Sequence, residues 1–167
     1  MGGLTHTLSG TSRYWVHATQ NVAVLLMVTI VFCVFWSYRE VQWTYPKFLL
    51  ALSGPGALYF LATTLIPDDP STVKSWHEYY FSIRIKLFVA FGLWAVLTAM
   101  ISTVVLEMRI THPARIGQIT ILAIALVGIV SKHPRVHATL ALAMLAAIVT
   151  FGLSIFLSPD AIKEAGV

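Results

Sequence analysis

Six histidines are the residues of this chain that could ligate a haem iron or a chlorophyll magnesium. A b-type haem in a membrane protein needs two imidazoles that face each other between helices, whereas a pigment can be held by one. Every histidine here falls in a tail, in a loop or within about two turns of the end of an apolar run. These positions argue against a haem held by two histidines and leave open a pigment ligated by His17 or His137 alone. The six are His6, His17, His77, His112, His133 and His137.

His17 belongs to a polar face near the start of the first apolar run. Gln20 and Asn21 follow it at i+3 and i+4, so the three side chains share one side of a helix. They are either solvated or bonded to a neighbouring helix, or they contact a lipid-like, quinone or pigment ligand. Trp94, near the middle of a later run, needs a partner or a buried ligand for its indole N–H. We take His17, Gln20, Asn21 and Trp94 as the candidate cofactor-binding residues.

His133 and His137 are four residues apart, which is a zinc-binding spacing on a continuous helix. Pro134 lies between them and suits the first turn of a helix, which leaves His133 outside it. No carboxylate is close in sequence, so we expect two interfacial histidines beside lipid phosphates rather than a metal site. The single cysteine, Cys33, excludes a disulfide within the chain and a cysteine-rich metal site.

The sequence contains none of the common catalytic signatures. It has no Gly-x-Ser-x-Gly elbow, no His-Glu-x-x-His helix and no Gly-x-x-x-x-Gly-Lys loop. Asp68 and Asp69 are adjacent, so they point apart on any regular element and are expected to end a span rather than act as an acid–base pair. No acidic or basic residue lies near the middle of an apolar run, which argues against proton or cation transport. We therefore expect a protein that is not an enzyme.

The composition places these residues in a membrane. The chain has 167 residues, of which 57% are hydrophobic and only 11% charged, whereas soluble domains carry about a quarter charged residues. The net charge is +4, but the basic residues are scattered singly between apolar runs. Such a distribution suits anionic lipid headgroups and excludes a nucleic-acid-binding face. The N-terminus lacks the pattern of a cleavable signal peptide.

The apolar runs predict an all-α fold, a polytopic transmembrane bundle of about five helices that forms a single domain over residues 1–167. The spans are expected at about 15–37, 46–66, 83–106, 114–130 and 136–157. Ser75 and Glu78 match a capping box, which predicts a short interfacial helix before the third span. An aromatic belt at headgroup level is expected there, formed by Trp76, Tyr79, Tyr80 and Phe81. Pro55 predicts a kink in the second span, at which the carbonyl freed on Ala51 is covered by another helix or satisfied by Ser53 or a water.

Two stripes of small residues suit close contact between helices. One lies on the third span and the other on the fifth, where the residues are spaced four apart. They are Ala95, Ala99 and Thr103, and Thr139, Ala143 and Ala147. The basic residues are divided almost evenly between the two sides of the predicted bundle, with a slight excess that places the N-terminus in the cytoplasm.

The turn Trp-x-Tyr-Arg-Glu-Val-x-Trp-Thr over residues 36–44 is the most distinctive pattern in the chain. With Gly54-Pro55, Tyr79-Tyr80-Phe81 and Arg84, it resembles a family of uncharacterised bacterial multi-pass membrane proteins. The resemblance implies a bacterial inner or intracytoplasmic membrane and no particular activity.

Two functional hypotheses follow. The first is a non-catalytic accessory subunit of a larger membrane complex, respiratory or photosynthetic, whose partners are the bilayer and other transmembrane subunits. The alternative is a small transporter or binder of a lipid-like, quinone or pigment ligand, with a pocket formed by the Pro55 kink, Trp94 and the face of His17.

Overall fold

A computed structural model describes residues 14–112 and 114–157 of the chain, and these residues are almost entirely helical. The α-helices are α2 (Trp15–Val34), α3 (Tyr45–Leu65), α4 (Trp76–Val104), α5 (Ala114–Val130) and α6 (Pro134–Leu157). Two 3₁₀ segments, η1 (Phe35–Glu40) and η2 (Pro70–Thr72), lie in the connections on either side of α3. Five helices and, among the described residues, no strand confirm the predicted all-α bundle.

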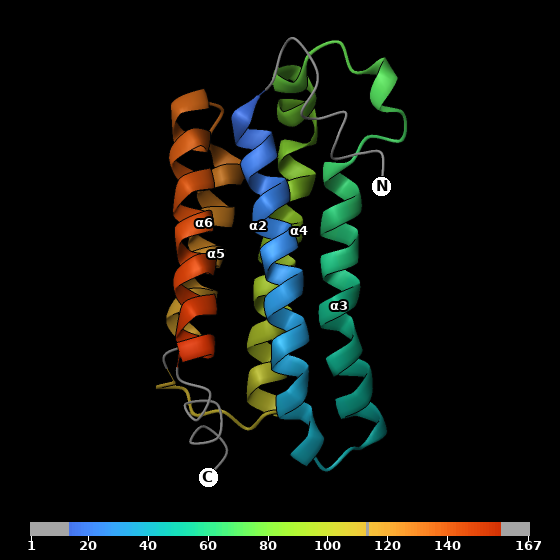
Figure 1. Cartoon of the computed structure of the whole chain (residues 1–167), viewed down its shortest axis with the longest axis vertical. Coiled ribbons are helices and arrows are strands. Elements are labelled where there is room, and N and C mark those ends of the chain that lie inside the picture. The colour runs from blue at the N-terminus through green and yellow to red at the C-terminus, as the bar shows by residue number, and fades with distance from the viewer. Residues whose placement is uncertain (1–13, 113, 158–167) are drawn as a thin grey trace.

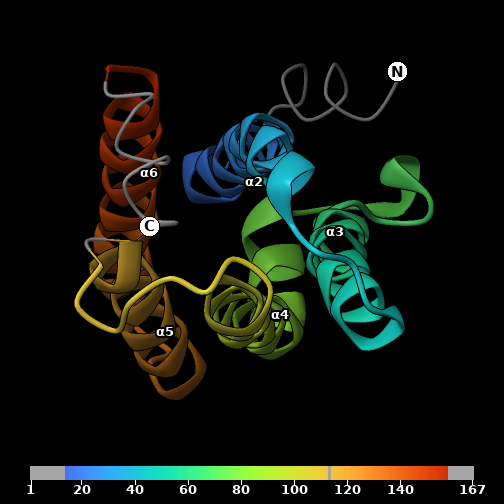
Figure 2. The same cartoon turned by 90° about the horizontal axis from the view of Figure 1, so that it is seen from below.

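The helices run alternately in opposite directions and stand side by side (Figure 1). Seen along the bundle, they form a ring in which each helix packs on its sequence neighbours, and α6 closes the ring against α2 (Figure 2). Because the number of helices is odd, α2 and α6 run in the same direction at this closure. One end of the bundle therefore gathers the starts of α2, α4 and α6, and the other gathers their ends.

Four of the helices are long and apolar enough to cross a membrane, namely α2 with η1, α3, α4 and α6. The fifth, α5, is apolar but has 17 residues, a length of about 26 Å against a hydrocarbon core of ~30 Å. Large apolar side chains such as Leu25, Leu93 and Leu126 face outward. These features fit an integral membrane protein.

The core is built mainly on α4, whose buried residues Tyr80, Leu87, Phe88 and Phe91 contact the surrounding helices. Helices α4 and α5 pack closely where the Phe88 ring lies directly over the backbone of Gly128. A side chain larger than hydrogen has no room there, so glycine is required by packing rather than by backbone conformation.

The predicted interfacial helix and third span form one continuous helix of 29 residues. The Ser75 hydroxyl accepts the backbone N–H of Glu78 at 3.4 Å, so the predicted N-terminal cap is confirmed. The helix does not break at the expected membrane boundary because the first turns of α4 are themselves packed against α2. Only the short η2 precedes α4, and Asp69 caps it by accepting the backbone N–H of Ser71 at 2.9 Å.

Helix α3 passes through Pro55 without interruption. A neighbouring helix covers this point as predicted, since a Cβ on Gly54 would lie 3.0 Å from Cδ1 of Ile101 on α4. The Ser53 hydroxyl donates to the Leu50 carbonyl at 2.6 Å. It therefore does not donate to the Ala51 carbonyl, which loses its usual partner to the proline.

Candidate functional site

Polar and aromatic side chains gather at the end of the bundle where α2, α4 and α6 begin, which we call the His17 end. His17 is 2% exposed and its Nε2 lies 2.9 Å from the carbonyl oxygen of Leu65, the last residue of α3. A carbonyl only accepts, so we assign the ring hydrogen to Nε2. The ring stacks on Trp76 with centroids 5.1 Å apart. His17 thus satisfies a carbonyl at a helix end that has no partner within the helix.

His137 likewise donates a hydrogen bond to a backbone carbonyl at the C-terminal end of α5. It is fully buried, and its Nε2 lies 3.0 Å from the carbonyl oxygen of Ser131, one residue beyond the end of α5. Arg84 donates to the same oxygen at 2.8 Å, and a cation at a helix C-terminus is favourable. Because Nε2 donates, Nδ1 of the neutral ring accepts the hydroxyl of Tyr80 at 3.1 Å.

The prediction that His137 is interfacial beside lipid phosphates is therefore wrong, and so is the placing of Trp76 and Tyr80 in an aromatic belt. Trp76 is 7% exposed, and Tyr80 and His137 are fully buried. Their burial arises because α2, α4 and α6 begin at the same end, so that residues from three separate stretches fill the space between the first turns. His133 lies outside the helix as predicted and is exposed.

The predicted polar face of α2 does come together around His17. Asn21 donates to the His17 carbonyl at 2.9 Å, and its amide lies 3.5 Å from Nδ1 of the ring. The Gln20 side chain is fully buried beside Tyr80. Trp94 does not join this group, because it lies 14 residues beyond Tyr80 on α4, about 21 Å along the axis. The His17 face and Trp94 therefore do not form one pocket.

The His17 end is organised for packing. Both buried histidines commit Nε2, a usual ligand atom for haem or zinc, to a helix-terminal carbonyl. In the described part of the chain no three His, Cys, Asp or Glu side chains come close enough to hold a metal ion. The arrangement joins α2 to α3 and α5 to α6 through specific hydrogen bonds, and this is its evident role.

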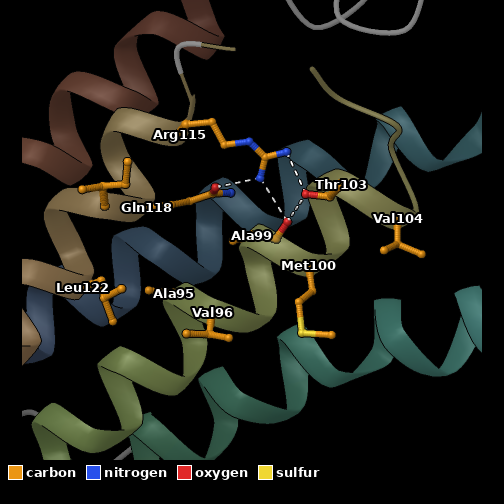
Figure 3. A pocket seen from close by; sticks show the side chains of 10 residues that line it. Ala95, Val96, Ala99, Met100, Thr103, Val104, Arg115, Gln118 and Leu122 are labelled. Atoms are coloured by element: carbon orange, nitrogen blue, oxygen red, sulfur yellow. Dashed lines mark hydrogen bonds between the residues drawn. The ribbon is translucent and has the colours of Figure 1, made fainter. Parts of the chain in front are cut away.

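A groove opens at the opposite end, between α4 and α5 (Figure 3). Its volume is about 420 Å³, within the usual range of about 300–1,000 Å³ for small-molecule sites. Side chains on its rim, such as Val96, Met100 and Ile119, are exposed, so the groove opens sideways. The lining residues are Ala95, Val96, Ala99, Met100, Thr103, Val104, Arg115, Gln118, Ile119 and Leu122.

Arg115 stands at the end of this groove nearest the α4–α5 loop. Its Nη1 donates to the Ala99 carbonyl, the Ser102 hydroxyl and Gln118 Oε1 at 3.0, 2.8 and 3.2 Å. Its Nη2 donates to the Thr103 hydroxyl at 2.9 Å and to the Met108 carbonyl at 3.2 Å. These acceptors fix the guanidinium at the groove wall.

No carboxylate in the described residues forms an ion pair with Arg115, so its charge is not neutralised there. The carboxylate nearest in sequence, Glu107, instead binds Lys47 of α3 at 2.8 Å. The hydrogen bond and charge of Lys47 lower the pKa of Glu107 below its ordinary value, which keeps this carboxyl ionised in that pair. The groove therefore combines an apolar lining with one uncompensated cation.

The groove itself was not predicted from the sequence, which indicated on this face of α4 only a surface for close contact between helices. The predicted small-residue stripe of Ala95, Ala99 and Thr103 lines the groove. The stripe predicted on α6 lies beside the buried line of that helix instead, where His137 and Ala141 are fully buried and Thr139 is exposed. Arg115 and Gln118 are not among the site residues predicted from the sequence. Their i, i+3 spacing at the start of an apolar run places both side chains on one face of the helix, and this was the one pattern that could have indicated them.

Comparisons with protein-family models, with curated proteins and with solved structures find no match to this chain. The site must therefore be interpreted from its own geometry.

Proposed function

We propose that this protein is a non-catalytic integral membrane protein that binds a lipid-like amphiphile in the groove between α4 and α5. The observation that carries the proposal is the groove itself, about 420 Å³ in volume, which is open to the side of the bundle and apolar except near Arg115 and Gln118. A ligand that enters from the bilayer would find its apolar part matched by the groove and its polar part by the residues beside the loop.

The length of the groove supports this proposal. From Val104 to Ala95 it follows nine residues of α4, about 14 Å along the axis, and from Arg115 to Leu122 it follows about 11 Å of α5. Half of a ~30 Å hydrocarbon core is about 15 Å. The groove is thus as deep as one leaflet and suits one acyl or isoprenoid chain, whether of a phospholipid, a quinone or a pigment.

A second candidate is an accessory subunit of a larger respiratory or photosynthetic complex. The same groove supports it, because the small side chains of Ala95 and Ala99 allow close approach of a helix from another subunit. In either case the expected location is a bacterial inner or intracytoplasmic membrane, as the family resemblance implies.

The two candidates are separated by filling the groove. Ala99→Phe places a ring in it, and Ala146→Phe makes the same change at an exposed position of α6. Each protein would be purified in mild detergent and analysed by native mass spectrometry for small molecules and for other chains. We expect the wild type and Ala146→Phe to retain a lipid-like molecule that Ala99→Phe loses.

Loss of a partner chain from Ala99→Phe, with no small molecule on the wild type, would support the accessory subunit instead. Retention of neither by the wild type would refute both candidates.

A further inference from the structure

The charge of Arg115 bears on the kind of headgroup that the groove accepts. An arginine with only carbonyl, hydroxyl and amide acceptors around it keeps its full positive charge, and in the described residues no acidic side chain pairs with it. Near a membrane surface such a charge attracts anionic lipid by about 1 kcal/mol. A guanidinium N–H also donates a strong, charge-assisted hydrogen bond to a phosphate oxygen.

We infer that the groove selects a phospholipid with a net negative headgroup, whose phosphate binds Arg115 while one acyl chain lies between α4 and α5. This inference rests on the proposed function, since it names the headgroup of the ligand proposed there. It differs from that proposal because a neutral lipid would satisfy the apolar groove equally well.

The geometry around Arg115 allows a phosphate to approach. The Nη2 bond to Thr103 is the exposed one of its contacts, whereas the Nη1 bonds to Ala99, Ser102 and Gln118 are partly buried. A phosphate oxygen can therefore replace the Thr103 hydroxyl as acceptor on Nη2 while the Nη1 bonds hold the guanidinium in place. A charged acceptor is stronger than the neutral one that it replaces.

The position along the helix also agrees with a headgroup. Arg115 is the second residue of α5, and Met108, whose carbonyl it binds, is in the loop after α4. The guanidinium is thus at the end of the apolar helix, where phosphates of a bilayer lie, and the groove extends from it toward the middle of the membrane. The opposite arrangement, a cation at the inner end of the groove, would have excluded a phospholipid.

The test uses the full chain in detergent, equilibrated with equal amounts of phosphatidylglycerol and phosphatidylcholine and examined by native mass spectrometry. For the wild type we expect about fivefold more bound phosphatidylglycerol than phosphatidylcholine. Arg115→Gln should bind both about equally. Arg109→Gln, which removes the same charge from an exposed position of the same loop outside the groove, should keep the preference.

Arg115 also holds α4 and the loop together, so its replacement could act through folding alone. Arg115→Lys keeps the positive charge but lacks the branched guanidinium. It should restore most of the preference for phosphatidylglycerol that Arg115→Gln loses. If the wild type binds the two lipids equally, the inference is overturned and the proposed function stands. If the wild type binds neither lipid, the inference and the proposed function are both overturned. If it binds inorganic phosphate but no lipid, the inference is overturned as well.

Discussion

The contact between Phe88 and Gly128 predicts that Gly128→Ala destabilises the bundle strongly. The new Cβ would lie 2.5 Å from Cγ and Cε1 of the Phe88 ring, whereas carbon atoms in contact are about 3.5–4.0 Å apart. The ring must therefore move by about 1 Å, and it is fully buried, with the His137 ring at 5.4 Å and the Phe91 ring at 6.2 Å. Overpacking a core costs about 1–3 kcal/mol of stability. Because the Phe88 ring is confined, we expect Gly128→Ala to lower the free energy of unfolding by about 3 kcal/mol.

Gly117 of α5 provides the matched control, because a Cβ there meets no atom within 4 Å. Gly117→Ala should be neutral or should stabilise the helix by about 0.5–1 kcal/mol. The measurement is reversible unfolding in detergent micelles, followed by helical circular dichroism. Phe88→Leu should cost less in the Gly128→Ala background than in the wild type, since it removes the ring that clashes. If Gly128→Ala unfolds with a free energy within about 0.5 kcal/mol of Gly117→Ala, the packing argument is refuted.

Three further perturbations test other contacts. Tyr80→Phe leaves Nδ1 of the buried His137 without its donor and should cost about 1–3 kcal/mol; unfolding in detergent measures this, and an unchanged stability would contradict the hydrogen-bond assignment. Ser75→Ala removes the N-cap of α4 and should cost about 1 kcal/mol, detected as a lower unfolding midpoint and as faster hydrogen exchange in the first turn of the helix. The Lys47–Glu107 pair lowers the pKa of Glu107, so its contribution to stability is present above the ordinary glutamate pKa and is lost as the pH falls through the lowered value. Lys47→Met should therefore reduce the acid dependence of unfolding, and a pH profile identical to that of the wild type would count against the pair.

The helices of this protein could be predicted from sequence because their signals are local. A run of apolar residues long enough to cross a bilayer, Pro46 in the first turn of α3 and Ser75 before α4 each act within a few residues. The same is true of Pro55, whose effect on the carbonyl one turn earlier indicated that another helix could pack there. These features need no knowledge of which helices are neighbours.

The site depended on contacts that no local signal contains. Trp76 and Tyr80 have the pattern of interfacial aromatics, yet they are buried because His17 and His137, some 60 residues away on either side, meet them at the same end of the bundle. An aromatic residue in the first turn of a helix shows the same sequence pattern whether it faces lipid or a neighbouring helix. Arg115 is likewise absent from the predicted site residues, because its acceptors on α4 lie near it only when α4 and α5 pack together.

The closure of the ring by α2 and α6 has a consequence for biosynthesis. On α6, a Cβ at Gly152 would lie 3.2 Å from Cδ1 of Ile30, so α2 and α6 pack closely near the end of both helices. During translation α2 is made before α6 and enters the membrane earlier. The face of α2 that α6 covers lacks that partner until α6 has been made. A ribosome that stops before α6 would release a bundle with an open seam, which is the form that quality-control proteases or an assembly factor would meet.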